Sequence, residues 1–224
     1  SAMYNKGMTK EETLFLIEAI LKNGERLKFS QKLVADKHSI GGIPGNRTTP
    51  VVVAICVALG LTMPKTSSRA ITSAAGTADT VETIAKVDFN MKDLKKIVDK
   101  TGGCLVWGGG LGMVPADAKI IKVEKKLKMD PEAQLLASII SKKLAAGSKY
   151  VLIDIPYGKT AKVSLLKARR LRKKFISIAE SFGIKMHVVL TKAKEPIGNG
   201  IGPVLEMIDV LKVLNPKESG PADL

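Results

Sequence analysis

The chain has 224 residues, 45% of them hydrophobic and only 4% aromatic, so it can bury a sizeable core built mainly from aliphatic side chains. We find neither a secretory signal nor an apolar stretch long enough to cross a bilayer, and we therefore expect a cytoplasmic protein without a membrane partner. The formal net charge of +15 is of the kind that nucleic-acid-binding proteins carry.

Much of this positive charge lies in one segment, residues 162–174, which holds seven Lys or Arg residues and no acid. Apolar residues recur between them at helical spacing, which predicts an amphipathic helix with a solvated basic face. The segment lacks the repeated aromatic residues of an RNA-binding surface. We therefore expect no nucleic-acid partner, and the charge is suited to attracting small anionic substrates.

The hydrophobic pattern predicts helices and strands in alternation. Thr9 and Glu12 form a capping box for a first helix that ends near Asn23. Further helices are expected at 49–59, 77–84, 91–100, 130–146, 162–174 and within 198–214, and strands at 31–35, 62–65, 104–107, 150–155 and 185–190. The nearly all-apolar 49–59 helix is expected to be deeply buried. Strands that are near-continuous apolar runs predict an α/β fold, with a central mostly parallel or mixed sheet covered by helices on both faces.

Two segments have the composition of anion-binding loops. Residues 67–82, S-S-R-A-I-T-S-A-A-G-T-A-D-T-V-E, join hydroxyl side chains and an arginine to small residues and a helix start. Residues 37–42, K-H-S-I-G-G, run from a strand into a glycine turn. Exposed backbone amides, hydroxyls and a helix N-terminus together bind phosphate-like anions. The two segments predict an enzyme that handles phosphate.

These residues resemble the thymidine/pyrimidine-nucleoside phosphorylase family, most closely its archaeal AMP phosphorylase branch. Residues 67–82 satisfy every fixed position of the family signature, and the similarity extends through 37–42, 114–117, 138–143 and 220–224. It therefore covers nearly the whole chain and implies a nucleoside phosphorylase or phosphoribosyltransferase-like fold. Family members are longer at both ends, so the resemblance implies a central portion of a homo-oligomeric enzyme, which alone is expected to turn over poorly.

The family arrangement implies two lobes with the active site in the cleft between them. Residues 1–27 and 114–146 are expected to form the two parts of a small all-helical lobe. Residues 28–113 and 147–224 are expected to form the two parts of the phosphate-binding α/β domain.

The resemblance implies phosphorolysis of nucleoside 5′-monophosphates in nucleotide salvage, with AMP and phosphate giving adenine and ribose 1,5-bisphosphate. Phosphate is a co-substrate, and no cofactor or metal is expected. A lysine with several hydroxyls suits a tetrahedral oxyanion, although each Ser or Thr alone would be read as a cap or turn residue. The implied phosphate ligands are Lys37, Ser39, Thr49, Ser67 and Thr77. The implied AMP contacts are Gly42, Ser68, Arg69, Ala70, Ile71, Thr72, Ser73, Thr77, Ser138, Lys142 and Lys162.

Ser138 and Lys142 lie four positions apart, so both point from one face of the expected helix. In thymidine phosphorylases the matching pair holds the pyrimidine together with an arginine. That arginine is missing here, because its place falls at Val123 and Glu124. Thymidine or pyrimidine-nucleoside phosphorolysis therefore stays as an alternative, weakened by the incomplete clamp.

Asp130 and Lys162 each have two interpretations. Asp130 is followed by Pro131 and Glu132, a pattern typical of a helix N-cap, whereas the resemblance makes it the catalytic proton donor to the departing purine. Lys162 is either a contact to the nucleotide 5′-phosphate or part of the solvated basic helix face.

Structural roles can explain several other residues. His187 lies in an apolar strand and is expected to be a core histidine, and no His, Cys or carboxylate cluster has metal-ligand spacing. Asp79 and Glu82 are similar to the magnesium-binding acids of anthranilate phosphoribosyltransferases, but helix capping and packing explain them equally well. A magnesium-dependent phosphoribosyltransferase and a nucleic-acid-binding module therefore remain as alternatives from other classes.

Overall fold

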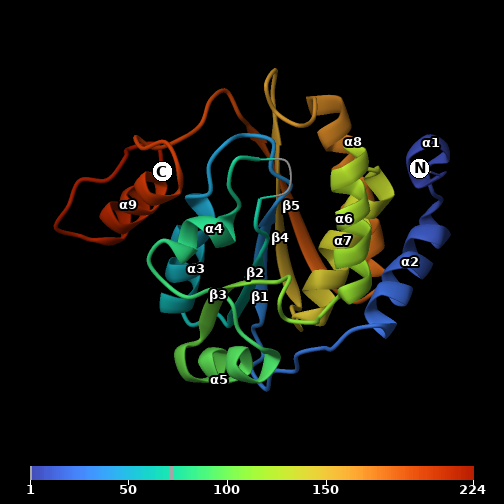
Figure 1. The fold of residues 1–224 in the computed structure, drawn as a ribbon, viewed down its shortest axis with the longest axis horizontal. Coiled ribbons are helices and arrows are strands. Elements are labelled where there is room, and N and C mark those ends of the chain that lie inside the picture. Colours follow the sequence, from blue (N-terminus) through green and yellow to red (C-terminus); the bar gives the residue numbers. More distant parts are fainter. Residues whose placement is uncertain (1, 71–72) are drawn as a thin grey trace.

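The computed structural model describes residues 2–70 and 73–224, which form an α/β fold with parallel strands (Figure 1). One sheet has the order β1-β4-β5 and a second pairs β2 with β3. The strands are β1 (Ala35–Ser39), β2 (Met63–Ser67), β3 (Gly103–Trp107), β4 (Tyr150–Tyr157) and β5 (Lys185–Lys192). A parallel bridge between Val34 and Thr62 joins the two sheets, and the Ala35 N–H donates to the Thr62 carbonyl at 2.8 Å. The resulting order is β3-β2-β1-β4-β5 with every pairing parallel, which agrees with the predicted α/β class.

This strand order reverses its direction of growth between β1 and β4. From β1 the chain adds β2 and β3 on one side, and later adds β4 and β5 on the other. In open parallel sheets, ligands bind beyond the carboxyl ends of the strands at such a reversal. The loops that follow Ser39 and Tyr157 are therefore the first place to look for a site.

Helices surround the strands in two groups. With the sheet lie α3 (Thr48–Ala58), α4 (Thr77–Glu82), α5 (Met91–Thr101), α8 (Leu165–Glu180) and α9 (Pro203–Leu214). On one side of the molecule lie α1 (Ala2–Lys6), α2 (Lys10–Lys22), α6 (Pro115–Leu127) and α7 (Glu132–Ala145) (Figure 1). One hydrophobic core joins Ile17 of α2 and Ile140 of α7 to Ile153 of β4 and Phe175 of α8. The helical group therefore packs directly on the sheet, and its division into a separate lobe stays a prediction.

Local sequence signals explain how several helices begin and end. The Glu12 N–H donates to the Thr9 hydroxyl at 3.1 Å and the Thr9 N–H to the Glu12 carboxylate at 2.8 Å, which confirms the predicted capping box. The α8 helix begins after the Ser164 cap, and its buried stripe includes Leu171 and Phe175. The predicted amphipathic basic helix is confirmed in this form, although it begins three residues later than expected.

Three expectations about the sheet and its covering are wrong. Strand β1 starts at Ala35, where the expected strand ends, because its register with β4 pairs Ala35 with Tyr150. The α3 helix is not deeply buried: one face packs on the sheet, while Ile55 is 49% exposed and the C-cap residue Leu59 is 74% exposed. His187 is exposed rather than a core residue.

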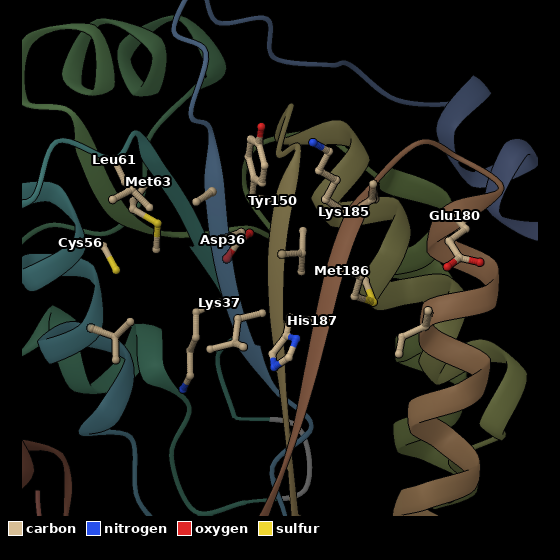
Figure 2. A pocket seen from close by; sticks show the side chains of 16 residues that line it. Asp36, Lys37, Cys56, Leu61, Met63, Tyr150, Glu180, Lys185, Met186 and His187 are labelled. Atoms are coloured by element: carbon tan, nitrogen blue, oxygen red, sulfur yellow. The ribbon is translucent and has the colours of Figure 1, made fainter.

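The reason for the exposure of His187 is that one face of the β1-β4-β5 sheet is open within the described residues. A cavity of about 610 Å³ lies over this face between α3 and α8, and Tyr150 and His187 line it (Figure 2). Helices flank the sheet as predicted, with α3 packed against β1, β2 and β3 and α8 against β4 and β5, and the part left uncovered is the face around this cavity.

Candidate active site

The phosphate ligands expected on β1 lie close to the carboxyl end of that strand. Lys37 is buried and extends away from Tyr150 and Lys185, the first residues of β4 and β5 (Figure 2). Its Nζ lies 3.4 Å from the hydroxyl of Thr49, in the first turn of α3. Burial lowers the pKa of Lys37, and the nearby carboxylates Asp154 and Asp36 oppose this shift. A partly desolvated ammonium beside a hydroxyl is well suited to an oxyanion.

The signature loop follows β2, on the same edge of the sheet. Ser67 ends that strand and its carbonyl accepts a hydrogen bond from the Gly108 N–H at 3.0 Å. The loop then folds back on itself so closely that a Cβ at Gly76 would lie 2.4 Å from the Ser68 carbonyl oxygen. Only glycine fits this approach, which explains why Gly76 directly precedes Thr77.

Asn46 connects the two expected phosphate loops. The Thr77 hydroxyl donates to the Asn46 side-chain oxygen at 3.1 Å, and the Asn46 amide group donates to the Ala75 carbonyl at 3.2 Å. The backbone N–H of Asn46 also donates to the Glu206 carboxylate at 2.7 Å. The structure thereby brings Thr77 to the loop that precedes α3 and Thr49, as an anion site formed from both segments requires.

Arg69 binds carboxylates of its own chain. Its guanidinium donates to Asp79 at 3.1 Å and to Glu82 at 2.8 Å, and it lies 4.9 Å from the centre of the Trp107 ring. The Asp79 carboxylate also accepts the N–H groups of Ala70 and Gly76, each at 2.8 Å. Although burial opposes it, these hydrogen bonds lower the pKa of Asp79. Capping and loop support therefore account for Asp79 and Glu82.

Among the other AMP contacts expected in this loop, one residue forms a local hydrogen bond and two lie outside the part of the chain that the structure describes. The Ser73 hydroxyl donates to the Ala75 carbonyl at 2.8 Å. Ile71 and Thr72 lie outside the described residues.

The expected base-binding pair Ser138 and Lys142 shares one face of α7, as predicted. Lys142 Nζ lies 2.6 Å from the Ser138 hydroxyl. Both groups contact Asp117, a fully buried carboxylate in the first turn of α6. The Ser138 hydroxyl donates to this carboxylate at 3.0 Å, and Lys142 Nζ lies 2.6 Å from it. The Gln134 side-chain amide also donates to it, at 2.9 Å. Sequence reasoning gave Asp117 no role, because its three partners on α7 cannot be read from its position at a helix start.

Asp130 is not the N-cap of α7, and Lys162 is not part of the basic face of α8. Pro131, not Asp130, occupies the N-cap position of α7, and no side chain caps that helix. Lys162 lies before α8, whose cap is Ser164, and forms an ion pair with Asp130. The Lys162 backbone packs against the first glycine loop, since a Cβ at Gly42 would lie 2.4 Å from the Lys162 Cβ. Asp130 and Lys162 therefore face the sheet reversal instead of serving α7 and α8.

Glu124, in the last turns of α6, is a residue that the sequence analysis noted only as the place of a missing arginine. Its side chain is half-buried, and its Oε1 atom is buried without a hydrogen-bond partner among residues 2–70 and 73–224. Burial first, and then the charges of Asp130 and Asp117, raise the pKa of Glu124 to about 7, against the opposing charges of Lys142 and Lys162. It is thus a carboxyl group that holds its proton near neutral pH.

A network of buried charged side chains connects β1, the strand that carries Lys37, to β2 and α7. Asp36 of β1 lies 2.7 Å from Lys143 of α7 and 3.5 Å from Lys65 of β2. Burial lowers the pKa of Lys143 to about 8, against the attraction of Asp36. The same lysines, after burial itself, hold the pKa of His38 well below its usual range, so this ring is neutral. The network fixes β1, and with it Lys37, relative to β2 and α7.

Within 2–70 and 73–224, no group of three or more His, Cys, Asp or Glu side chains is arranged to hold a metal ion. None of the helices described there combines the length and the apolar character that a membrane crossing needs.

Comparison with known proteins identifies relatives of the whole chain. A model of the α/β domain of a glycosyl transferase family matches residues 31–165. A Ralstonia nicotianae protein named "Putative thymidine phosphorylase" is 52% identical over 225 residues, and the AMP phosphorylase of Natronomonas pharaonis is 50% identical over 224 residues. Each alignment covers 100% of this chain but 44% of the relative, so the chain spans less than half of their length.

The fold itself has solved counterparts. The anthranilate phosphoribosyltransferase of Thermus thermophilus aligns with 96% of this chain and 71% of its own, with a TM-score of 0.76 and 16% sequence identity. At that identity the likeness concerns the fold alone. It agrees with the predicted phosphoribosyltransferase-like architecture.

Proposed function

The chain belongs to this glycosyl transferase family, and we propose that it cleaves the N-glycosidic bond of nucleoside 5′-monophosphates by phosphorolysis. The proposed reaction converts AMP and phosphate to adenine and ribose 1,5-bisphosphate. One relative bears the name AMP phosphorylase. The proposal assigns one part of the sheet edge to each reacting group.

Inorganic phosphate would bind at the carboxyl ends of β1 and β2. Lys37 supplies the positive charge there, and Thr49 lies within 3.4 Å of its amine. Ser39, Ser67 and Thr77 supply further hydroxyls, and the loop after Ser39 adds backbone N–H groups. This combination of one ammonium with neutral donors binds a tetrahedral oxyanion without a metal ion.

A second cation at the sheet reversal carries the nucleotide assignment. Lys162 lies against Gly42 of the phosphate loop and beside Asp130, away from the basic face of α8. A nucleoside needs one cation for the attacking phosphate, whereas a nucleotide needs another for its 5′-phosphate. We propose that Lys162 is that second cation and that the 5′-phosphate replaces Asp130 as its partner; the contact with Gly42 and the ion pair with Asp130 support this proposal.

Bond cleavage then requires a proton for the leaving base. An oxygen of phosphate bonds to C1′ as the C1′–N9 bond breaks, and the electron pair of that bond passes to the purine. A carboxylic acid that protonates N7 relieves the developing negative charge. We propose Asp130 as this acid. In its ion pair with Lys162 it is a carboxylate; once the 5′-phosphate has replaced it at Lys162, it would take up a proton from solvent and then donate that proton to N7 of the base held by Ser138 and Lys142, returning to the carboxylate.

Thymidine phosphorolysis is the second candidate. The relatives with the two names are nearly equally similar to this chain, at 52% and 50% identity. Ser138 and Lys142 would suit a pyrimidine as well as a purine. The feature that favours AMP is the placement of Lys162, because thymidine has no 5′-phosphate to bind.

The test is base release by the full-length protein from AMP, CMP, UMP and thymidine, with and without phosphate. We expect phosphate-dependent release that is fastest from a nucleotide. Activity confined to thymidine would overturn the nucleotide assignment. A requirement for diphosphate and Mg²⁺, lost in EDTA, would indicate a phosphoribosyltransferase instead. Tight, steeply salt-dependent binding to nucleic acid without base release would indicate a binding module.

A further inference from the structure

Helix α9, to which the proposed reaction assigns no residue, packs against both helices that follow the proposed phosphate loops (Figure 1). Met207 of α9 is buried in one hydrophobic cluster with Val51 of α3 and Val81 of α4. Thr49 lies in the first turn of α3, and Thr77 is the first residue of α4. The α9 helix therefore contacts the two elements that carry hydroxyls of the proposed phosphate site.

Two carboxylates of α9 hold the short segment that directly precedes α3. The backbone N–H of Asn46 donates to Glu206 at 2.7 Å. The next residue, Arg47, is only 3% exposed, and its Nε donates to Asp209 at 2.8 Å. Glu206 and Asp209 lie three positions apart, so both point from one face of α9. That face fixes the position of Asn46.

The glycine-rich turn before α9 closes around Arg47. The guanidinium donates to the carbonyl of Gly200, and a Cβ at Gly198 would lie 2.7 Å from Arg47 Cδ. The Asp209 carboxylate also accepts the N–H groups of Asn199 and Gly200, each at 2.9 Å. A shift of this segment relative to α9 would break several hydrogen bonds to a buried guanidinium, which is costly.

The side chain of Asn46 reaches from this fixed backbone to the signature loop. Its amide nitrogen donates to the Ala75 carbonyl at 3.2 Å, so its oxygen is turned toward Thr77 and accepts the Thr77 hydroxyl at 3.1 Å. A threonine side chain without such a partner rotates about χ1, and a ligand must then order it. Asn46 removes this cost, because it holds the Thr77 oxygen in one place.

Binding of phosphate does not require the bond between Asn46 and Thr77 to break. A hydroxyl group has one proton to donate and two lone pairs that accept. Inorganic phosphate keeps a proton at neutral pH, so its own O–H can donate to the Thr77 oxygen while the Thr77 proton stays on Asn46. The contact can thus support the ligand in the free and in the bound protein.

From this chain of contacts we infer that Asn46 is a positioning residue of the phosphate subsite, which acts through the Thr77 hydroxyl, and that Glu206 acts through Asn46. This inference rests on the proposed function for the role of Thr77 as a phosphate ligand. It deepens that function by giving α9 a part in phosphate binding.

Calorimetric titration of the full-length protein with inorganic phosphate tests the inference without requiring turnover. One hydrogen bond changes an equilibrium by roughly 2- to 10-fold, so Asn46→Ala should weaken phosphate binding by a factor in that range. Glu206→Ala should do the same, whereas Glu206→Gln keeps an acceptor for the Asn46 N–H and should bind phosphate nearly as wild type does. Asn5→Ala, at an exposed position of α1, is the matched control.

A double-mutant cycle separates positioning of Thr77 from a general structural role. In a Thr77→Val background, Asn46→Ala should weaken phosphate binding by less than about 2-fold, because the hydroxyl that Asn46 holds is already gone. Losses that multiply in the double variant would overturn the inference. With AMP as substrate, Asn46→Ala should raise the KM for phosphate and leave the KM for AMP unchanged. Equal increases in both would also overturn it.

The inference and the proposed reaction can fail separately. A protein that cleaves AMP, but binds phosphate equally well with and without the Asn46 side chain, would overturn the inference alone. A protein that does not cleave AMP, but whose phosphate affinity depends on Asn46 and Thr77 as a coupled pair, would overturn the proposed reaction and support the inference.

Discussion

The carboxylate of Asp130 and the ammonium of Lys162 form an ion pair that joins the segment before α7 to the loop between β4 and α8. Both groups are partly exposed, with 47% of the Asp130 side chain and 34% of the Lys162 side chain accessible. Exposed ion pairs contribute about 0–1 kcal/mol, so a phosphate dianion can displace this carboxylate readily. In the proposed reaction, this exchange of partners would couple binding of the 5′-phosphate at Lys162 to release of Asp130.

Replacing Lys162 should penalise nucleotides selectively. Charge-assisted hydrogen bonds are worth about 1.5–3 kcal/mol, so Lys162→Ala should lower kcat/KM for AMP by roughly 10- to 100-fold and leave adenosine nearly unchanged. Steady-state kinetics with both substrates measures this ratio. Arg169→Ala, which removes an exposed charge from α8, is the control. Equal losses for AMP and adenosine would contradict the assignment.

Replacing Lys37 should instead affect every substrate. The buried Lys37 amine lies beside Thr49 at the proposed site of inorganic phosphate. Lys37→Ala should raise the KM for phosphate and slow AMP and adenosine alike, by roughly 10- to 100-fold. Phosphate titrations at saturating AMP provide the measurement, with the exposed Lys100→Ala as control. An unchanged KM for phosphate would place the anion elsewhere.

Asp130→Asn tests proton donation. General acids contribute about 10²- to 10⁴-fold to rate, so this variant should release adenine from AMP more slowly by a factor in that range. A nucleotide of 7-methylguanine carries a positive charge on its base already and needs no proton from the enzyme. Its phosphorolysis should therefore be much less affected. Equal slowing of both substrates would show that Asp130 acts only through Lys162.

Gly42 and the adjacent Gly41 separate steric contact from backbone strain. Both have positive φ angles, +105° and +75°, so alanine at either position carries strain of about 1–2 kcal/mol. Only at Gly42 would the new Cβ meet Lys162, at 2.4 Å from its Cβ and 2.5 Å from its N. Gly42→Ala should cost AMP turnover roughly 10- to 100-fold more than Gly41→Ala. It should also lower Tm further, because the atoms it meets include the Lys162 backbone, so both variants are assayed well below their Tm. Similar kinetics for the two variants would argue against a Lys162 site.

Local patterns in the sequence were sufficient for most of the fold. Capping at Thr9 and apolar periodicity located most of the helices, and alternating strands gave the α/β class. The start of β1 was wrong because strand limits depend on pairing with β4, which lies more than a hundred residues away. The burial of α3 and the exposure of His187 depend on which faces are covered, and apolar composition does not carry that information.

The site was predictable where residues lie close in sequence. Ser138 and Lys142 share a helix face, and that relationship follows from their spacing. The Lys143–Asp36 pair spans 107 positions and the Arg47–Asp209 hydrogen bond spans 162, so neither could be inferred from local spacing. Glu124 was missed for the same reason, since the charges that raise its pKa come from several elements.

The raised pKa of Glu124 gives a final prediction about stability. Between about 4.5, the ordinary value for Glu, and about 7, the folded chain keeps a proton that the unfolded chain releases. Stability attributable to Glu124 therefore falls as pH rises through this range. Glu124→Gln cannot ionise, so its stability relative to wild type should grow from near zero at pH 4.5 to a plateau above pH 7. Since the side chain is half exposed, screening limits the plateau to about 1 kcal/mol, or about 2–4 °C in Tm.

The measurement is the Tm of both proteins at intervals across this pH range. Glu18→Gln serves as the control, because Glu18 is an exposed carboxyl on α2. Its pH profile of Tm should run parallel to that of wild type. A difference between Glu124→Gln and wild type that stays constant from pH 4.5 to 8 would mean that Glu124 titrates normally.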